Sequence, residues 1–455
     1  MTPSRDQALL WRRVPVPEEM LGDGPAGPCG GDLRIGDLDG DGRVEFVVYR
    51  NLAGLKPGFI AAFDLDGRPL WSFGDPGREV AVIEEDGEQR RGLEPPERPG
   101  PVAVADIDGD GRIEVLALAL PEGVERTHHW RMDGVELVVL DGPTGEVKQR
   151  RVCEELRAAD GYVDGELLPP NYVHQRLMLC DLSGAGRAGD VVVKVGQRVF
   201  VFNDELELLW TYDCRWNRYP NHCAYIPAVG DVDLDGRDEV NLGNAVIDDD
   251  GTPLWERFIA QHNDSVLVEE WDGRPRAICS GFGQVLDETG EPLVRLGPDA
   301  VPHGQEIRCG TLRSDSPGPQ LVIRYDGHAP KLMIVGRGGD VLDRFEVPVS
   351  PNNTGLEVVR WNGPGGPDVI YSPAALADGR GRVIADLPEL PAPSGGNQGW
   401  YHCFPADVCG DEREEIVLYD PLAASVFIYT PRPLEEAAYR GYSHGPRQYN
   451  ARLMD

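Results

Sequence analysis

The chain has 455 residues, 77 acidic and 44 basic side chains, and a formal charge of −33 at pH 7. This acidity argues against nucleic acid or an anionic membrane as a partner, because like charges repel. The nine cysteines show no paired spacing, which favours a reducing compartment over a disulfide framework. No signal peptide and no apolar run long enough to cross a membrane is visible. We therefore expect a monomeric cytoplasmic protein, or a secreted one if a leader has been removed.

An Asp-rich turn followed by a β-prone segment recurs along the chain. The clearest copies are GDLDGDGRVEFVVY (36–49), ADIDGDGRIEVLAL (105–118) and GDVDLDGRDEVNLG (230–243). Weaker copies lie at 180–195 and 406–419, and the segments 268–281, 309–325 and 358–372 keep only the apolar pattern. Later in each unit a second hairpin follows, as in AVIDDDGTPLWE (245–256). Each unit therefore reads as four antiparallel strands.

Repeated four-stranded units are typical of propeller blades. The sequence predicts an all-β fold, with one eight-bladed β-propeller over residues 1–455. Seven blades are the alternative if one weak copy is a loop, and a sandwich of the same strands is a second alternative. We expect the final blade around 403–430, with the N-terminal segment as the candidate that closes it. Segments 85–100 and 121–135 are expected to be surface insertions, which leaves His128 and His129 solvated.

Three Asp-rich turns carry carboxylates at identical spacing. They are Asp37, Asp39, Asp41 and Glu45; Asp106, Asp108, Asp110 and Glu114; and Asp231, Asp233, Asp235 and Glu239. Alternate carboxylates in a Gly-containing turn suit a hard cation that prefers oxygen ligands, so the sequence predicts Ca²⁺ at each turn. These are not EF-hands, because the Glu stands at position 9 and enters a strand. The weaker copies lose ligands at Ser183, Ala185 and Cys409, and we expect weak binding or none there.

Five histidines precede the first strand of a unit, where a propeller opens onto one face. They are His174, His222, His262, His303 and His402. Each one taken alone is explained as a surface or core residue, but their matching positions predict a shared site at the channel mouth. Neighbouring arginines, including Arg176, Arg218 and Arg308, would make that mouth attractive to anions. A histidine-bound metal such as Zn²⁺ is less favoured, because no HxH or HxxxH pair is present.

Two segments resemble a known family. DVCGDEREEIVLYDP (407–421) is similar to the Gly-Asp-x-Arg-Glu-Glu segment near the C-terminus of family 11 rhamnogalacturonan lyases. GRDEVNLGNAVIDDDGTPLW (236–255) and AQHNDSV (260–266) resemble a second stretch of that family, and the turns resemble FG-GAP and VCBS repeats. The resemblance implies an eight-bladed propeller with structural Ca²⁺ and a uronate-containing, rhamnose-containing glycan as substrate. That family usually has a β-sandwich and a secretion signal before the propeller, and propeller lyases acting on ulvan or rhamnosyl-glucuronate ends fit the length better.

The implied reaction is β-elimination next to a uronate. A cation, from Arg218, Arg308 or a bound Ca²⁺, would neutralise the carboxylate, and a histidine or Tyr219 would remove the C5 proton. The segment RWNRYPNHCAY (215–225) combines these groups, so His222 with Tyr219 and Arg218 is the preferred set. The further members of the site are His174 with Arg176, His262 with Asp264, and His303 with Arg308.

Two other functions stay open at this stage. A glycoside hydrolase would need a pair of carboxylates across the cleft, for which Asp264 and Glu306 are the candidates. A non-catalytic propeller that binds a glycan or a protein is the other, because a fold does not specify a function.

Overall fold

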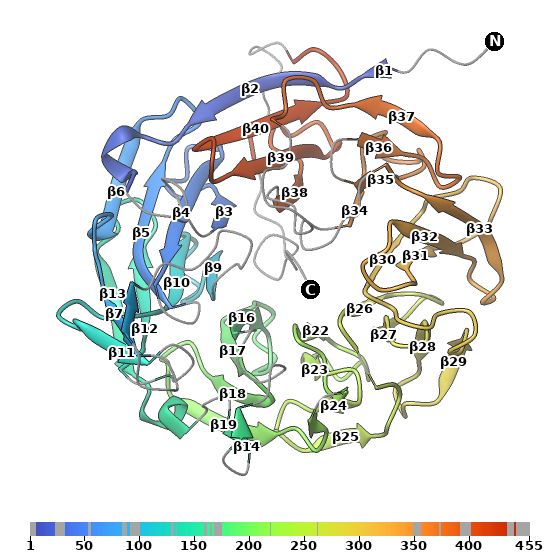
Figure 1. Cartoon of the computed structure of the whole chain (residues 1–455), viewed down its shortest axis with the longest axis horizontal. Helices are drawn as coiled ribbons and strands as arrows, with labels where there is room; N and C mark the ends of the chain where they lie inside the picture. Colours follow the sequence, from blue (N-terminus) through green and yellow to red (C-terminus); the bar gives the residue numbers. More distant parts are fainter. Residues whose placement is uncertain are drawn as a thin grey trace.

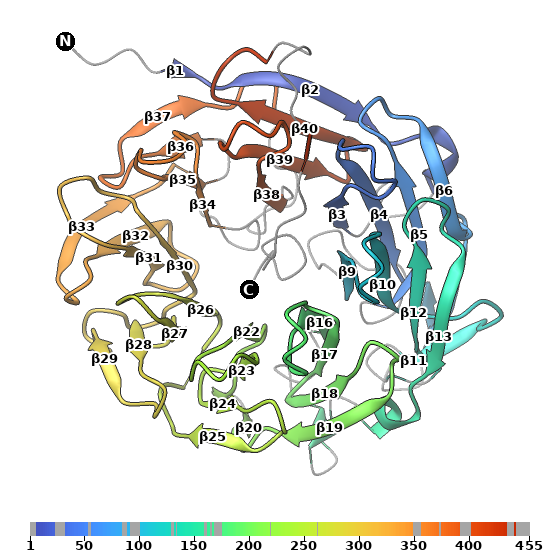
Figure 2. The ribbon, with the colours of Figure 1, turned by 180° about the vertical axis from the view of Figure 1, so that it is seen from behind.

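Eight sheets form a ring around a central axis, which confirms the predicted eight-bladed β-propeller (Figures 1 and 2). The computed structural model describes residues 6–22, 32–52, 56–83, 89–91, 101–128, 132, 134–158, 162–163, 166–167, 175–218, 220–261, 263–348, 356–372, 375–391, 402–434 and 441–442. These residues contain no α-helix, only the 3₁₀ turns η1 (Glu18–Met20) and η2 (Glu154–Ala158). No helix within them is long and apolar enough to cross a bilayer.

The blades follow one another in chain order, and each is a meander of four antiparallel strands. Blades 1 to 4 are β3 (Asp32–Gly36), β4 (Glu45–Asn51), β5 (Pro57–Phe63), β6 (Pro69–Gly74); β9 (Val102–Ala105), β10 (Glu114–Ala119), β12 (Glu136–Asp141), β13 (Val147–Val152); β16 (Gln175–Cys180), β17 (Asp190–Val195), β18 (Arg198–Phe202), β19 (Leu208–Asp213); and β22 (Ala228–Gly230), β23 (Glu239–Asn241), β24 (Ala245–Ile247), β25 (Pro253–Glu256).

Blades 5 to 8 complete the ring. They are β26 (Val266–Glu270), β27 (Pro275–Cys279), β28 (Gln284–Leu286), β29 (Pro292–Arg295); β30 (Glu306–Gly310), β31 (Gln320–Arg324), β32 (Lys331–Val335), β33 (Val341–Glu346); β34 (Glu357–Val359), β35 (Val369–Ser372), β36 (Ala375–Ala377), β37 (Val383–Asp386); and β38 (His402–Ala406), β39 (Glu415–Asp420), β40 (Ser425–Thr430) with β2 (Leu9–Pro15). The short strand β1 (Asp6–Gln7) pairs in parallel with β37.

The N-terminal segment closes the ring, as the sequence indicated. Strand β2 pairs with β40 and becomes the outer strand of blade 8, although more than 400 residues separate Arg13 from Ser425. A hydrophobic cluster then joins blade 8 to blade 1, with Phe404 and Ile428 packed among Phe46 and Phe63. The N-terminal segment thus supplies the outer strand of the last blade, and the sheet edges that remain in a propeller are short and protected.

The hydrophobic core is divided among the blade interfaces. The second and third strands of a blade are buried on both faces, so side chains of alternate residues pack against the preceding and the following blade. One buried cluster lies between each pair of neighbouring blades, from blades 1 and 2 around to blades 8 and 1. The nearly continuous Val, Leu and Ile runs of the second strands follow from this two-sided burial.

A tryptophan on the outer strand of blade 1 locks that blade to the outer hairpin turn of blade 2. Trp71 of β6 donates its Nε1 hydrogen to the carbonyl of Gly142, 2.6 Å away, in the β12–β13 turn of blade 2. Gly145 in that turn has a φ of +68°, and a Cβ there would lie 2.5 Å from the Trp71 ring. Glycine is therefore required at this position both for the turn and for the close approach of the indole.

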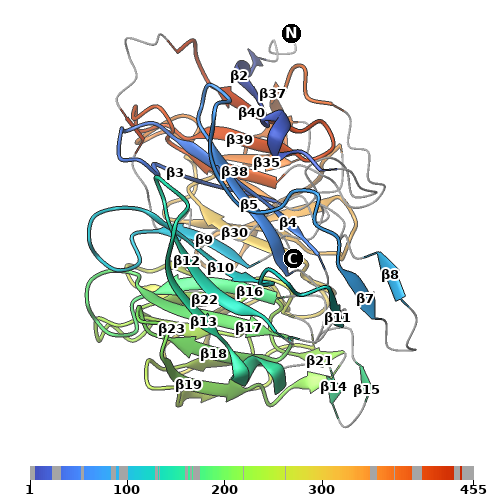
Figure 3. The same cartoon turned by 90° about the vertical axis from the view of Figure 1, so that its left-hand side faces the viewer.

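The two faces of the propeller carry different features. Because consecutive strands are antiparallel, the Asp-rich turns and the outer hairpin turns lie on one face, which we call the Asp-turn face. The remaining connections lie on the opposite face, which we call the hairpin face after the short inserted strands that it carries. These strands are β7 (Ala81–Ile83), β8 (Gln89–Arg91), β11 (Arg126–His128), β14 (Tyr162–Val163), β15 (Glu166–Leu167), β20 (Asn217–Arg218) and β21 (Asn221–His222). Figure 3 shows this hairpin face in side view, with β7, β8, β11, β14, β15 and β21 along it.

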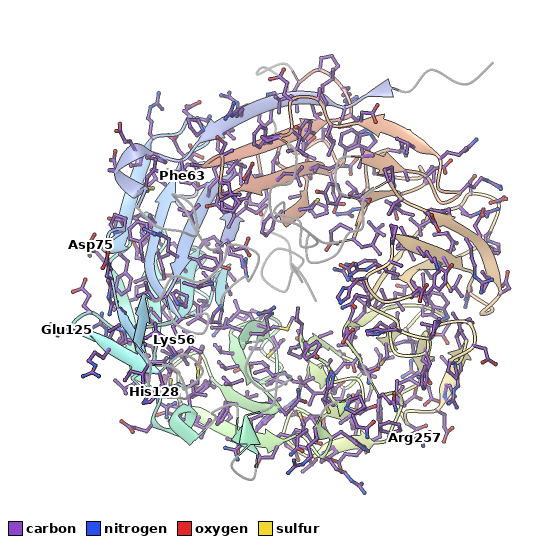
Figure 4. All side chains as sticks on the ribbon, in the orientation of Figure 1. Lys56, Phe63, Asp75, Glu125, His128 and Arg257 are labelled. Carbon is purple, nitrogen blue, oxygen red and sulfur yellow. The ribbon has the colours of Figure 1, made fainter. Side chains whose placement is uncertain are left out.

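The insertion around residue 128 is more ordered than its sequence predicts. His128 ends β11, which pairs in parallel with β7, so it is not the solvated loop residue that we expected. Lys56, which is fully buried, donates to the carbonyl oxygen of His128 at 2.7 Å and to Thr127 Oγ1 at 3.2 Å (Figure 4). The buried lysine thereby fastens the insertion to blade 1. His129 lies outside the described residues.

Candidate functional site on the hairpin face

His303 and Asp264 form a pair on the hairpin face, from the segments that lead into blades 6 and 5. The Nε2 atom of His303 lies 2.9 Å from Asp264 Oδ2. Asp264 is almost fully buried, whereas the His303 side chain is 38% exposed. The hydrogen bond to Asp264 raises the pKa of His303 above its ordinary value, against the effect of burial. An accessible imidazole oriented by a buried carboxylate is suited to proton transfer near neutral pH.

Ser265 and Arg308 extend this pair toward the channel. Arg308 of β30 lies 3.3 Å from Ser265 Oγ through Nη1, and 3.2 Å from Glu357 Oε1 of β34 through Nε. Arg308 is only 5% exposed, so its guanidinium is enclosed by these partners. We call His303, Asp264, Ser265, Arg308 and Glu357 the Asp264 cluster. His303 and Arg308, which we grouped together from the sequence, both belong to this cluster, His303 through Asp264 and Arg308 through Ser265 and Glu357.

Glu306 lies beside the cluster and is paired with an arginine. Its Oε2 atom lies 2.9 Å from Arg324 Nη2, and both side chains are 0% exposed. Its other oxygen accepts a hydrogen bond from the backbone of Leu356 at 3.1 Å. A carboxylate held in this way cannot approach a sugar or activate a water. The geometry therefore argues against Asp264 and Glu306 as the carboxylate pair of a glycoside hydrolase.

His222 is placed differently from what its sequence context led us to expect. It is 0% exposed, and its Nδ1 lies 2.8 Å from the carbonyl oxygen of Cys223. Its ring packs on Tyr225 with centroids 4.6 Å apart. A base for a sugar proton must be reachable by the substrate, so this burial argues against His222 as the base and favours His303.

Asn244 links the β20–β21 hairpin to the segment that carries Asp264. Its side-chain nitrogen donates to the carbonyls of His222 and Ala260, and its oxygen accepts from Ile259 and from Asn263 Nδ2. Asn244 and Asn263 are both 0% exposed. We did not single out either asparagine from the sequence. The available signal was their position inside the two family-like stretches 236–255 and 260–266.

The other predicted site residues are dispersed. Arg218 is exposed on β20, on the hairpin face. Arg176 is 8% exposed at the start of β16, near the buried Tyr49. His174, His262 and Tyr219 lie outside the described residues. His402 begins β38, but its side chain is not described, so the convergence of five histidines stays a prediction.

The Asp-rich turns share one local structure. In the first turn, Asp37 Oδ2 accepts from the Gly42 amide at 3.0 Å, and Glu45 Oε2 accepts from the Leu38 amide at 2.7 Å. The same two bonds recur at 106–114 and 231–239, with the residues shifted accordingly. Each turn brings three acidic residues within reach of one ion, and Cys409 replaces an acid in the related cluster of Asp407 and Glu415.

Two turns contain carboxylate oxygens that need a further partner. Asp37 Oδ1 and Glu239 Oε1 are buried and make no hydrogen bond within the described structure. Burial raises the pKa of Glu45 and of Glu239 to about 8. A hard cation would satisfy these oxygens and keep the carboxylates ionised, so the residues fit Ca²⁺. Metal in these turns would lie on the Asp-turn face, a strand length from the Asp264 cluster, which argues against Ca²⁺ held there as the group that neutralises a uronate.

The family model for the C-terminal domain of rhamnogalacturonan lyase family 11 matches residues 193–279. This stretch runs from β17 to β27 and includes Asn244, Asn263 and Asp264. The chain is 27% identical over 280 residues to the rhamnogalacturonan exolyase YesX of Bacillus subtilis (strain 168), covering 53% of this chain and 42% of that protein. It is 25% identical over 321 residues to the rhamnogalacturonan endolyase YesW of the same organism, covering 60% and 48%. The chain thus spans less than half the length of these relatives.

Solved structures share the fold. The crystal structure of the rhamnogalacturonan lyase YesW superposes with a TM-score of 0.66 at 19% identity, covering 93% of this chain and 76% of that one. The Bacillus licheniformis rhamnogalacturonan lyase PL11 gives 0.65 at 17%, covering 96% and 78%. The V. cholerae biofilm matrix protein Bap1 gives 0.60 at 14%, covering 96% and 92%. The chain is a β-propeller that resembles the family 11 rhamnogalacturonan lyases.

Proposed function

We propose that the protein is a polysaccharide lyase that acts on rhamnogalacturonan. The observation that carries this proposal is the match of residues 193–279 to the lyase family, because these residues build the asparagine network and supply Asp264. The two curated relatives are an exolyase and an endolyase, so the mode of cleavage is left open by the comparison.

The finer proposal is β-elimination at a uronate, with His303 as the base. In this reaction the base takes the C5 proton, a C4=C5 double bond forms, and the C4–O4 bond breaks as the leaving sugar gains a proton. Neutral His303 would accept the C5 proton, and Asp264 would orient the ring and stabilise the imidazolium that forms. Arg218 is the exposed cation that would neutralise the uronate carboxylate and so make the C5 proton more acidic.

The proposal is tested by incubating the purified protein with rhamnogalacturonan and following the ultraviolet absorbance of the unsaturated product. We expect the wild type to produce that absorbance, and His303→Gln to reduce the rate by a factor of about 10²–10⁴, the usual contribution of a general base. Arg218→Ala should raise KM and lower kcat. The matched control is Arg380→Ala, in a turn on the Asp-turn face, which should keep wild-type kinetics.

Other outcomes separate the alternatives. New reducing ends without ultraviolet absorbance would indicate a hydrolase, and binding without either signal would indicate a non-catalytic propeller. A His303→Gln variant with full activity would exclude His303 as the base while leaving the lyase proposal intact.

A further inference from the structure

The outer strand carries a bulge at its second residue in seven of the eight blades. At this point one residue is skipped in the pairing with the third strand. The skipped residue is aliphatic in six blades, namely Leu70, Leu209, Leu254, Leu293, Leu342 and Ile384. In blade 2 it is Lys148. The repeat therefore places one ammonium group where the other blades have a hydrocarbon side chain.

The Lys148 side chain reaches into the Asp-rich turn of its own blade. Its Nζ lies 2.7 Å from Asp108 Oδ2, 2.8 Å from Glu114 Oε1 and 3.4 Å from Asp110 Oδ2. The Lys148 side chain is 26% exposed and the Glu114 side chain 0%. Lys148 donates hydrogen bonds to Asp110 Oδ2 and Glu114 Oε1, and a lysine side chain is an ammonium at neutral pH. One positive charge thus contacts three of the four acids of this turn.

The two matching turns lack such a cation. Within the described part of the chain, no lysine or arginine lies within ion-pair distance of the acids of turns 37–45 and 231–239. The residues that correspond to Lys148 in blades 1 and 4 are Leu70 and Leu254. Each of these two turns contains a buried carboxylate oxygen without a hydrogen-bond partner, at Asp37 and at Glu239. Both oxygens of Glu114, in contrast, have a partner or contact solvent. The buried oxygens without a hydrogen-bond partner therefore occur in the two turns whose blades carry leucine in place of Lys148.

We propose that Lys148 is a built-in substitute for calcium, so that turn 106–114 is closed by this side chain while the matching turns 37–45 and 231–239 bind Ca²⁺. An ammonium and a divalent cation would compete for the same carboxylate oxygens, and two cations bound to the same oxygens repel each other strongly. The turn therefore holds one or the other, not both. The three turns are nearly identical in sequence. Their affinities for calcium would thus be set by the outer strand, 34 residues beyond Glu114.

This assignment predicts a reciprocal exchange between blades. Lys148→Leu, which installs the side chain of the other blades, should increase the calcium bound per chain by one. Leu254→Lys, which installs the ammonium over turn 231–239, should decrease it by one. Lys331→Leu is the matched control, because its ammonium pairs with Asp326 at 2.7 Å on the hairpin face and should leave the calcium content unchanged.

Bound calcium is measured by equilibrium dialysis at fixed free Ca²⁺, followed by elemental analysis and compared with the wild type. The melting temperature with and without EDTA is the second readout, and Leu254→Lys should reduce the stabilisation by calcium. Equal calcium contents in the wild type and Lys148→Leu would overturn the proposal, and so would an unchanged content in Leu254→Lys. If Lys148→Leu does not fold, Lys148→Gln and Leu254→Lys still decide the question.

Discussion

Removing Arg324 should be one of the most damaging single substitutions in the ring. Arg324→Met leaves Glu306 buried without the guanidinium that lies 2.9 Å from it, and both side chains are 0% exposed. Breaking a buried pair by deleting one partner typically costs about 3–5 kcal/mol, because the remaining charge stays out of water. Unfolding entropies near 2.1 cal/mol/K per residue, over 455 residues, amount to about 1 kcal/mol/K. The melting temperature should therefore fall by about 3–5 °C if the ring unfolds as one unit.

The assay is differential scanning calorimetry at pH 7 with calcium held constant. The double variant Glu306→Leu with Arg324→Met should recover most of the loss, since a buried pair replaced by hydrocarbon is often neutral or stabilising. The control is Asp213→Asn, which breaks the exposed pair of Asp213 with Arg198 and should shift the melting temperature by less than about 1 °C. An Arg324→Met protein that melts within 1 °C of the wild type would refute the reasoning.

Two further predictions concern His303 and calcium. Asp264→Asn should lower the pKa of His303, which NMR on histidine-labelled protein measures, and it should move the acid limb of the kcat/KM profile to lower pH. Arg324 and Asp326 also act on this imidazole, and both are unchanged in the variant. The raised pKa of His303 stabilises the fold below about pH 6.5, and this gain is lost as pH rises through the folded-state pKa. The difference in stability between Asp264→Asn and the wild type should therefore shrink at alkaline pH. A limb that moves to higher pH would contradict this. Glu239→Gln should remove the stabilisation that calcium gives through turn 231–239. At a free Ca²⁺ concentration of about 100 times the Kd, this stabilisation is worth about 2.7 kcal/mol, or roughly 3 °C in melting temperature. Identical EDTA shifts in the variant and the wild type would argue against metal at that turn.

Local patterns in the sequence were enough to predict the strands, the turns and the number of blades. Alternating strand and Asp-Gly turn signals depend on residues that are neighbours in the chain, and each unit repeats them. The carboxylates of the three Asp-rich turns are gathered by the same short-range geometry, because the backbone amides of each turn bind its own acids. Closure by the N-terminal segment was also predictable, since a ring with a free edge would be exposed to aggregation.

The chemistry of the site was decided by contacts between blades. His303 meets Asp264 across 39 residues and Arg308 meets Glu357 across 49, and neither pair has a local signature. His222 looked favourable because arginine and tyrosine lie beside it in the sequence, but its side chain is 0% exposed and its ring packs on Tyr225. Lys148 reaches its turn because the sheet brings the start of the fourth strand to the same end of the blade as the turn between the first two strands. Sequence specifies what each blade is, while accessibility and charge pairing depend on which side chains the closed ring brings together.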